Sequence, residues 1–291
     1  MVISKQHFRG EGNYNMPIQK IKINRIFIYA ILLFITFLMF IPFAWMLSAS
    51  LKLDKDVFIF PIQWIPENPR WQNYIDIWNK IPLLTFIKNT AKLTIIVTGL
   101  QLLTSSFAAY AFAKLDFKHR NKLFLAYIAT IAVPWQVYMV PQFMMMRSFG
   151  LNDSHLAIIC LQAFSAFGVF LMRQFYLGVP DELCEAARID GMSEYMIYAK
   201  IMLPLSKPAI STLTIFTFVN TWNDFLGPLI YLKTEKKKTL QIGLRMFISQ
   251  YSSEYGLIMA ASVISLIPVF IIFISLQKYF VEGIASTGIK G

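Results

Sequence analysis

The chain has 291 residues, of which 56% are hydrophobic and only 15% are charged, and its mean hydropathy is +0.54. Soluble domains carry about a quarter charged residues, so this composition excludes an ordinary soluble protein and favours a polytopic membrane protein. The net charge of +11 comes from basic residues in loops beside apolar runs, which favours contact with anionic lipid over nucleic-acid binding.

Six runs with little or no charge divide the chain. Each is close to or above the roughly 20 residues that a helix needs to cross a bilayer. The runs cover 26–51, 93–113, 123–146, 154–172, 208–232 and 255–277. We therefore predict an all-α membrane protein whose permease domain, residues 26–280, has six transmembrane helices.

The polar ends and one basic loop predict the orientation. Segment 1–25 is too polar, and the apolar run behind it too long, for a signal peptide, whose core has roughly 7–15 residues. With six spans, the tails 1–25 and 281–291 lie on the same side as the loop 114–122, in which four of nine residues are basic. The positive-inside rule then places both termini in the cytoplasm of a prokaryotic cell, with the chain in its plasma membrane.

The stretch AVPWQVYMVP (132–141) predicts a bent helix. It carries two prolines inside an apolar run, and such prolines mark kinks whose freed backbone groups are satisfied by neighbours or water. Trp135, Gln136 and Tyr138 offer aromatic faces and an amide, which suit a sugar but are also common in helix packing. They are candidate residues of a solute pathway.

Asp224 is the single acid inside the six runs. A carboxylate within a spanning segment is costly and usually faces protein or water. Together with Asn223 it is a candidate contact to the solute or to a partner. The alternative, which we favour, is a structural hydrogen bond to Asn223 or to a neighbouring helix, because Pro228 predicts an interruption of the helix nearby.

A polar segment, ELCEAARIDGMSEYMIYAKIMLPLSKP (182–208), separates the fourth and fifth runs. Acids at its start favour a helix N-terminus, and Leu183, Ala186 and Ala187 are spaced for one helix face. Arg188 follows Glu185 by three residues, close enough for an ion pair.

Further signals predict a bend and a second helix in this segment. Gly191 suits a left-handed helix end, and Ser193 can cap the next helix. Pro204 is expected to end that helix. The pattern alone fits either a helix pair lying on lipid or a docking element.

This segment closely resembles the EAA loop of permeases of ATP-binding-cassette (ABC) importers, in which Glu-Ala-Ala, a later glycine and Ile-x-Leu-Pro recur. The matching positions are Glu185, Ala186, Ala187, Asp190, Gly191, Ile201, Leu203 and Pro204. The resemblance implies that 178–207, between helices 4 and 5, is a cytoplasmic coupling loop that docks in a groove of an ATPase subunit and transmits its motion.

Three further stretches resemble the MalG-like, carbohydrate-importing branch of that family: NYIDIW (73–78), FVNTWNDFLGPLIYL (218–232) and LQKYFVEGIASTGIKG (276–291). The family's last segment usually reads Gly-Ala-Val-Lys-Gly, and here it reads Thr287-Gly288-Ile289-Lys290-Gly291. The resemblance implies that Gly288 and Lys290 in the tail contact the ATPase.

The same resemblance implies a transport subunit for a sugar or oligosaccharide rather than an enzyme. Its partners would be a second homologous permease, two ATPase subunits that bind the ATP, an extracytoplasmic sugar-binding protein and the lipid membrane, with no nucleic acid and no cofactor or metal bound by this chain. In agreement, the sequence has no Gly-x-x-x-x-Gly-Lys-Ser/Thr phosphate loop. Two alternatives stay open: a permease for another solute such as a glycerophosphate, or an ion-coupled secondary carrier. The carrier predicts more intramembrane charge and gives no reason for the polar segment.

Overall fold

The computed structural model describes residues 18–248 and 254–288, and this part of the chain is helical, with no β-strand. Three helices are long: α1 (Ile18–Ser50), α3 (Leu83–Lys114) and α14 (Tyr255–Gly288). The other α-helices are α2 (Asn73–Lys80), α4 (Arg120–Ala129), α5 (Trp135–Ser148), α6 (His155–Gln162), α7 (Ala166–Leu177), α8 (Glu182–Ile189), α9 (Glu194–Ile197), α10 (Leu203–Leu205), α11 (Lys207–Trp222), α12 (Leu226–Tyr231) and α13 (Leu240–Met246). The predicted all-α class is confirmed for the described residues.

Four helical segments are long and apolar enough to cross a bilayer: Arg25–Ser50, Leu83–Lys114, His155–Leu177 and Tyr255–Tyr279. Two bent pairs pass the same test together, Arg120–Ala132 with Trp135–Ser148 and Glu194–Leu205 with Lys207–Trp222. The described chain therefore has four to six spanning segments, depending on whether each bent pair counts as one.

The bends lie beside prolines. The first pair is bent by 99° around Val133 and Pro134, where the residue before proline is extended, as proline requires. The second is bent by 78° at Ser206, between Pro204 and Pro208. The helix break expected at Pro204 is present close by, because α10 continues one residue further to Leu205 and the bend follows at Ser206.

A π-helical turn explains how Pro204 is accommodated. Residues Tyr198–Met202 form this turn between α9 and α10, and the N–H of Leu203 binds the Tyr198 carbonyl. Such a turn shifts the helical register, and Pro204, which has no N–H to place, directly follows the shift.

Helix α3 is the centre of the bundle and packs against α7 and α11. Small residues allow a close approach: a Cβ on Gly168 of α7 would lie 2.4 Å from Ser105 Oγ of α3. Close helix contact through small residues is the usual packing mode in membranes. Aromatic and aliphatic side chains complete a buried cluster that joins α3, α7, α11 and the polar segment.

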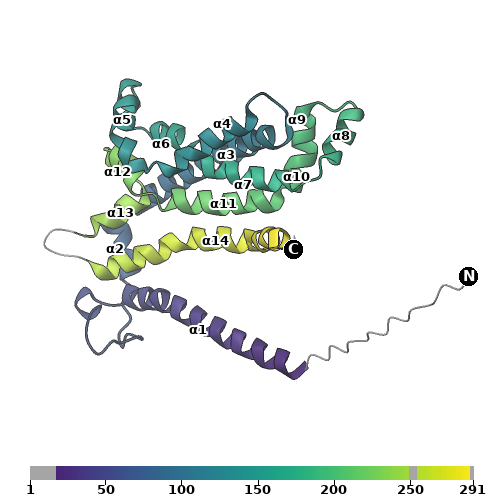
Figure 1. The fold of residues 1–291 in the computed structure, drawn as a ribbon. Helices are drawn as coiled ribbons and strands as arrows, with labels where there is room; N and C mark the ends of the chain where they lie inside the picture. The colour runs from purple at the N-terminus through teal and green to yellow at the C-terminus, as the bar shows by residue number, and fades with distance from the viewer. Residues whose placement is uncertain (1–17, 249–253, 289–291) are drawn as a thin grey trace, which may run out of the picture.

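Helix α1 diverges from the bundle (Figure 1). Its residues 25–40 are exposed, and it packs chiefly against α14. An apolar helix exposed on all sides fits a lipid environment or a partner. Figure 1 also shows that α8, α9 and α10 lie at the same end of the bundle as the start of α1 and the end of α14, whereas α2 and α13 lie at the opposite end.

Candidate functional site

The polar segment folds as two helices joined by a glycine turn. Gly191 has φ +80°, and no atom lies within 4 Å of a Cβ built on it, so the backbone conformation rather than space favours glycine. The N–H of Met192 binds the Ala187 carbonyl and the N–H of Gly191 binds the Arg188 carbonyl, which is a Schellman motif. Ser193 Oγ accepts from the N–H of Met196 at 3.4 Å. The predicted glycine bend and serine cap are confirmed.

One lysine ties the start of α8 to the last residue of α3. The Lys114 side chain is only 3% exposed, and its Nζ donates to the Asp181 carboxylate at 2.5 Å and to the Val179 carbonyl at 2.6 Å. This hydrogen bond and the ammonium charge hold the pKa of Asp181 below its usual range. The first helix of the segment is thus fixed to the central helix of the bundle.

A second tie joins α8 to α9 and to α3. Arg188 Nε donates to Glu194 Oε1 at 2.7 Å, and Tyr110 Oη of α3 donates to Glu194 Oε2 at 2.5 Å. The expected pairing of Arg188 with Glu185 is wrong, because the turn at Gly191 brings the start of α9 beside the end of α8. Glu185 is instead exposed.

The two alanines of the motif differ in burial. Ala187 is buried against the bundle, as is Cys184, whose Sγ lies 3.8 Å from Met202 Sδ. Ala186 is exposed. Leu183, Ala186 and Ala187 keep the spacing predicted for one side of the helix, but only Ala187 is buried against the bundle, whereas Leu183 and Ala186 are exposed.

The outer surface of the segment carries the remaining motif residues. Glu185, Asp190 and Gly191 are exposed beside Ala186, and Ile189 is 86% exposed. Farther along, Ile201 and Leu203 pack against the bundle cluster, while Pro204 is exposed. The motif thus has exposed residues around α8 and three residues, Ala187, Ile201 and Leu203, that pack against the bundle.

A cavity of about 440 Å³ lies among α3, α5, α6, α7, α11 and α12, away from the polar segment. Its polar lining includes Gln101, Gln142, Gln162, Ser165, Asn220 and Asp224. Its aromatic lining is Trp135, Tyr138, Phe167, Phe216 and Tyr231. The volume is in the range of small-molecule sites, and so is the mixture of aromatic walls with a few polar groups.

The structure brings some of the predicted pathway residues together. Trp135, Tyr138 and Asp224 line the cavity, and Trp135 Nε1 donates to Gln142 Oε1 at 2.8 Å. Gln136 and Asn223 are not among the lining residues, and Asn223 accepts instead from Gln241 Nε2 at 3.2 Å. Gly288 is the last residue of α14, and Lys290 lies outside the described residues.

Asp224 stands in the break between α11 and α12. Its Oδ2 accepts from Gln162 Nε2 at 2.8 Å, and its Oδ1 accepts from the N–H of Gly227 at 3.1 Å. The hydrogen bond to a neighbouring helix that the sequence favoured is present. The same carboxylate lines the cavity, so a structural role and a solute contact are compatible.

Sequence reasoning missed the amides of the cavity. Gln101, Gln142, Gln162 and Asn220 all stand inside apolar runs, where an amide is costly without a partner. That position in the sequence is a usable signal. The sequence does not show that these four amides meet in one cavity, because this depends on how four separate segments pack.

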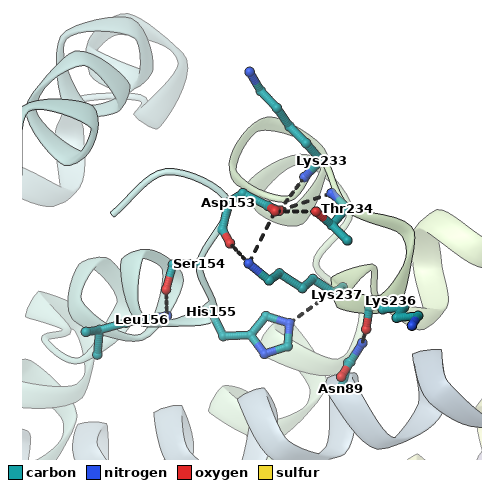
Figure 2. Close-up of polar contacts among 9 residues, drawn as sticks. All are labelled: Asn89, Asp153, Ser154, His155, Leu156, Lys233, Thr234, Lys236 and Lys237. Atoms are coloured by element: carbon teal, nitrogen blue, oxygen red, sulfur yellow. Dashed lines mark hydrogen bonds and ion pairs between the residues drawn. The ribbon is translucent and has the colours of Figure 1, made fainter. Parts of the chain in front are cut away.

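A polar cluster at the end opposite the polar segment was also missed (Figure 2). Asp153 accepts from the N–H groups of Lys233 and Thr234 at 2.8 and 3.1 Å and from Thr234 Oγ1 at 2.5 Å. Lys237 Nζ donates to the Asp153 carbonyl at 2.5 Å, and its own carbonyl accepts from His155 Nε2 at 2.7 Å. The hydrogen bonds that the Asp153 carboxylate accepts, first from the Thr234 hydroxyl and then from the N–H groups of Lys233 and Thr234, hold the pKa of Asp153 well below its usual range.

Asn89 completes this cluster from α3. Its Nδ2 donates to the carbonyls of Lys236 and Lys238 at 2.9 and 2.8 Å. The loop 233–239, which precedes α13, is therefore clamped to α3 and to the turn before α6, as Figure 2 shows.

The described residues form a helical bundle with long apolar helices, two bent helix pairs and a helical segment docked at one end. The fold matches a chain of a bacterial ABC transporter involved in the import of the acidic polysaccharide alginate, with a TM-score of 0.78 and 24% identity, over 94% of this chain and 100% of that one. Residues 101–286 match the model of the binding-protein-dependent transport system inner membrane component family, and the chain belongs to this family.

Curated relatives cover almost the whole chain. The arabinooligosaccharide transport permease AraQ of Halalkalibacterium halodurans is 36% identical over 261 residues, 89% of this chain and 94% of AraQ. The lactose permease LacG of Rhizobium radiobacter is 29% identical over 88% of this chain and 93% of LacG. The sn-glycerol-3-phosphate permease UgpE of Yersinia pestis is 32% identical over 88% of this chain and 92% of UgpE.

These comparisons confirm the family resemblance found in the sequence. The chain is a multi-pass membrane permease subunit of an ABC importer and not an enzyme. Family membership also implies the kinds of partner, namely a second permease, an ATPase and a solute-binding protein.

Proposed function

We propose that this chain forms one half of the translocation pathway of an ATP-driven importer of sugars or oligosaccharides, and that residues 178–207 couple it to a separate ATPase. The main observation behind this proposal is how α8 docks on the bundle. Glu185, Ala186 and Asp190 are exposed at α8, and the start of this helix is fixed to α3 through Lys114. A helix fixed in this way transmits a displacement instead of absorbing it. Relatives named for arabinooligosaccharides and lactose support a saccharide as the solute.

In this proposal residues 26–280 cross the plasma membrane six times. The bent pair Arg120–Ala132 and Trp135–Ser148 counts as one span, and the fifth span is 208–232, whereas Glu194–Leu205 stays outside the membrane with the rest of 178–207. The polar segment, the start of α1 and the end of α14 share one end of the bundle, which agrees with an even number of spans (Figure 1). The basic loop 114–122 supports a cytoplasmic location of that end, of the tail 1–25 and of the tail 281–291.

The proposed assembly contains this chain, a second homologous permease, two ATPase subunits and an extracytoplasmic binding protein. ATP is held by the ATPases, and this chain needs no cofactor of its own. The outer face of α8 would lie in the groove of one ATPase, and Gly288 and Lys290 in the tail would contact the same subunit.

The proposed mechanism is a rigid-body switch between two packed states. Closure of the ATPases on ATP would move α8, and the ties at Lys114 and Glu194 would pass this displacement to α3. Since α3 also packs on α7 and α11, the helices around the cavity would move with it. ATP and the loaded binding protein each shift the equilibrium by binding one state more tightly.

The test is Ala186→Arg, which places a long charged side chain on the exposed face of α8, with Ala186→Ser as the matched control. In proteoliposomes with all partners, we expect Ala186→Arg to abolish uptake, either because the ATPase no longer co-purifies or because ATP hydrolysis continues without transport. The serine variant should transport normally. Full uptake by Ala186→Arg would refute the coupling role.

The relative UgpE supports a second candidate solute, a glycerophosphate. Uptake of sn-glycerol 3-phosphate but of no saccharide by the assembled transporter would favour it.

A further inference from the structure

The cavity among α3, α5, α6, α7, α11 and α12 is lined by one acidic residue and by no basic residue among those described. Asp224 is the one charged residue among the described residues that line it, and the other polar groups are amides, aliphatic hydroxyls, two phenols and an indole N–H. Phosphate and carboxylate groups are usually bound by Arg or Lys or by free N–H groups at helix N-termini. Lys and Arg are absent from this described lining.

Two N–H groups near the cavity are already engaged. The N–H of Gly227 at the start of α12 binds Asp224 Oδ1, and the N–H of Gly168 at the start of α7 binds Ser165 Oγ at 3.0 Å. Neither is left for an anionic ligand. The charge of the cavity is therefore set by the carboxylate.

The surroundings of Asp224 hold this carboxylate as a hydrogen-bond acceptor. Each of its oxygens accepts one N–H, from Gln162 and from Gly227, and a carboxylate has about four acceptor positions in all. The remaining positions can accept from ligand hydroxyls. A Cβ at residue 227 would lie 2.5 Å from Asp224 Oδ2, so Gly227 leaves room for the carboxylate.

The remaining lining also suits a polyol. The Gln101 side chain is fixed by two hydrogen bonds. Its Oε1 accepts from Thr217 Oγ1 at 3.0 Å, and its Nε2 donates to the Gln162 carbonyl at 2.7 Å. Trp135 is held by Gln142. Fixed aromatic rings and amides around one acceptor match a ring that presents hydroxyl groups at its edge and C–H groups on its faces.

We propose that this cavity binds a neutral polyhydroxylated solute and that Asp224 determines its specificity, accepting solute hydroxyls and repelling anionic analogues such as sugar phosphates or uronates. The proposal rests on the proposed transport of saccharides and deepens it. It separates the two candidate solutes, because a glycerophosphate carries the charge that Asp224 disfavours.

The test is direct binding to the purified permease–ATPase complex without its binding protein, which removes selection by that subunit. The probes are arabinotriose, raffinose and lactose as neutral ligands, and sn-glycerol 3-phosphate and a galacturonate disaccharide as anions. Asp224→Asn removes the charge and keeps the shape. Asn223→Ala is the matched control, since Asn223 is the adjacent residue and is not among the lining residues.

We expect at least one neutral probe to bind the wild-type complex, and the anions to bind at least about tenfold more weakly. Asp224→Asn should weaken the neutral probe about tenfold and reduce the preference over anions, as expected for loss of a charged acceptor. Asn223→Ala should stay within about twofold of wild type. Asn220→Asp leaves the Asp224 contacts intact and should increase the preference for the neutral probe.

Three results would overturn the proposal: no binding of any neutral probe, an anion bound as tightly as the neutral probes, or unchanged affinity in Asp224→Asn. If Asp224→Asn does not assemble, unchanged selectivity in Asn220→Asp overturns it. Saccharide uptake by the complete transporter is measured separately. If the complete wild-type transporter takes up a saccharide but the cavity binds none, only the present proposal is refuted. If the complete wild-type transporter takes up no saccharide, the proposed function is refuted.

Discussion

Lys114 Nζ lies 2.5 Å from Asp181 Oδ1, although the two residues are separated by 67 positions in the sequence. Lys114 ends α3 and Asp181 precedes α8, so this contact joins the central helix of the bundle to the segment proposed to receive force from the ATPase. The lysine is buried and Asp181 is 75% exposed. The ion pair itself therefore contributes less than about 1 kcal/mol to stability. Its proposed role is to connect α3 to the start of α8.

Lys114→Met should impair coupling more than folding. The variant keeps the apolar stem but loses the bonds to Asp181 and to the Val179 carbonyl, so α8 is held less rigidly against α3. We expect normal recruitment of the ATPase and a several-fold lower number of solute molecules imported per ATP hydrolysed. Lys118→Met, an exposed lysine in the following loop, is the control and should behave as wild type. An unchanged transport ratio in Lys114→Met would contradict the role of this tie.

Substitutions at Gly191 can distinguish the cost of an unfavourable backbone conformation from the cost of a steric clash. A Cβ there meets no atom within 4 Å, so the penalty of a side chain arises from φ +80° alone. We expect Gly191→Val to lower the free energy of unfolding by about 1–2 kcal/mol, and Gly191→Asn by less, because asparagine tolerates the left-handed conformation. Thermal unfolding of the purified permease complex checks the order, and equal effects of Val and Asn would be inconsistent with it.

The contact of Gly168 with Ser105 predicts an overpacking effect. Gly168→Ala places a methyl group 2.4 Å from Ser105 Oγ, and such crowding costs about 1–3 kcal/mol. Adding Ser105→Ala removes the hydroxyl and should restore part of the loss. Denaturation of the single and double variants measures this coupling. If the two effects simply add, α3 and α7 do not pack as described.

The Asp153 cluster predicts a dependence on pH. Its donors depress the folded-state pKa of Asp153 below the unfolded value of about 3.9. The contribution of the carboxylate to stability is therefore fully present above the unfolded pKa, and it is lost as the pH falls through the folded pKa. The protection factors of the amides in the loop 233–239, which are corrected for the intrinsic pH dependence of exchange, should thus decrease once the pH drops below about 3.9.

Asp153→Asn isolates this effect. In that variant the loop should exchange faster at pH 7 and should respond less to acid. Asp116→Asn, an exposed acid in the loop after α3, should leave the loop unchanged. Identical pH profiles for wild type and Asp153→Asn would show that the cluster does not hold the loop.

Local chemistry made much of the fold predictable. Gaps in the charge distribution located the apolar segments, and Gly191 and Ser193 predicted the bend and cap in the polar segment because these preferences act within a few residues. Pro134 likewise marked the first bend. Pro204 marked the second bend to within two residues, but the π-helical turn before it was not predicted, since the proline itself does not encode such a turn.

Contacts between distant segments were not predictable in this way. Arg188 has an acid three residues before it, yet it pairs with Glu194 because tertiary docking sets the angle between α8 and α9. The same docking decides that Ala187 is buried and Ala186 exposed. Asp224 was recognised as unusual from the sequence, but its partner Gln162 comes from another run and was found only in the fold.

Labelling of a cysteine at position 186 decides whether α8 faces the cytoplasm and contacts the ATPase. Ala186→Cys is made together with Cys160→Ser, which removes the exposed native thiol, and Cys184 is buried. A membrane-impermeant thiol reagent should label position 186 in inside-out vesicles only, and bound ATPase should slow this labelling at least about tenfold. Labelling from the outer side, or a rate that ignores the ATPase, would contradict the coupling role of this segment.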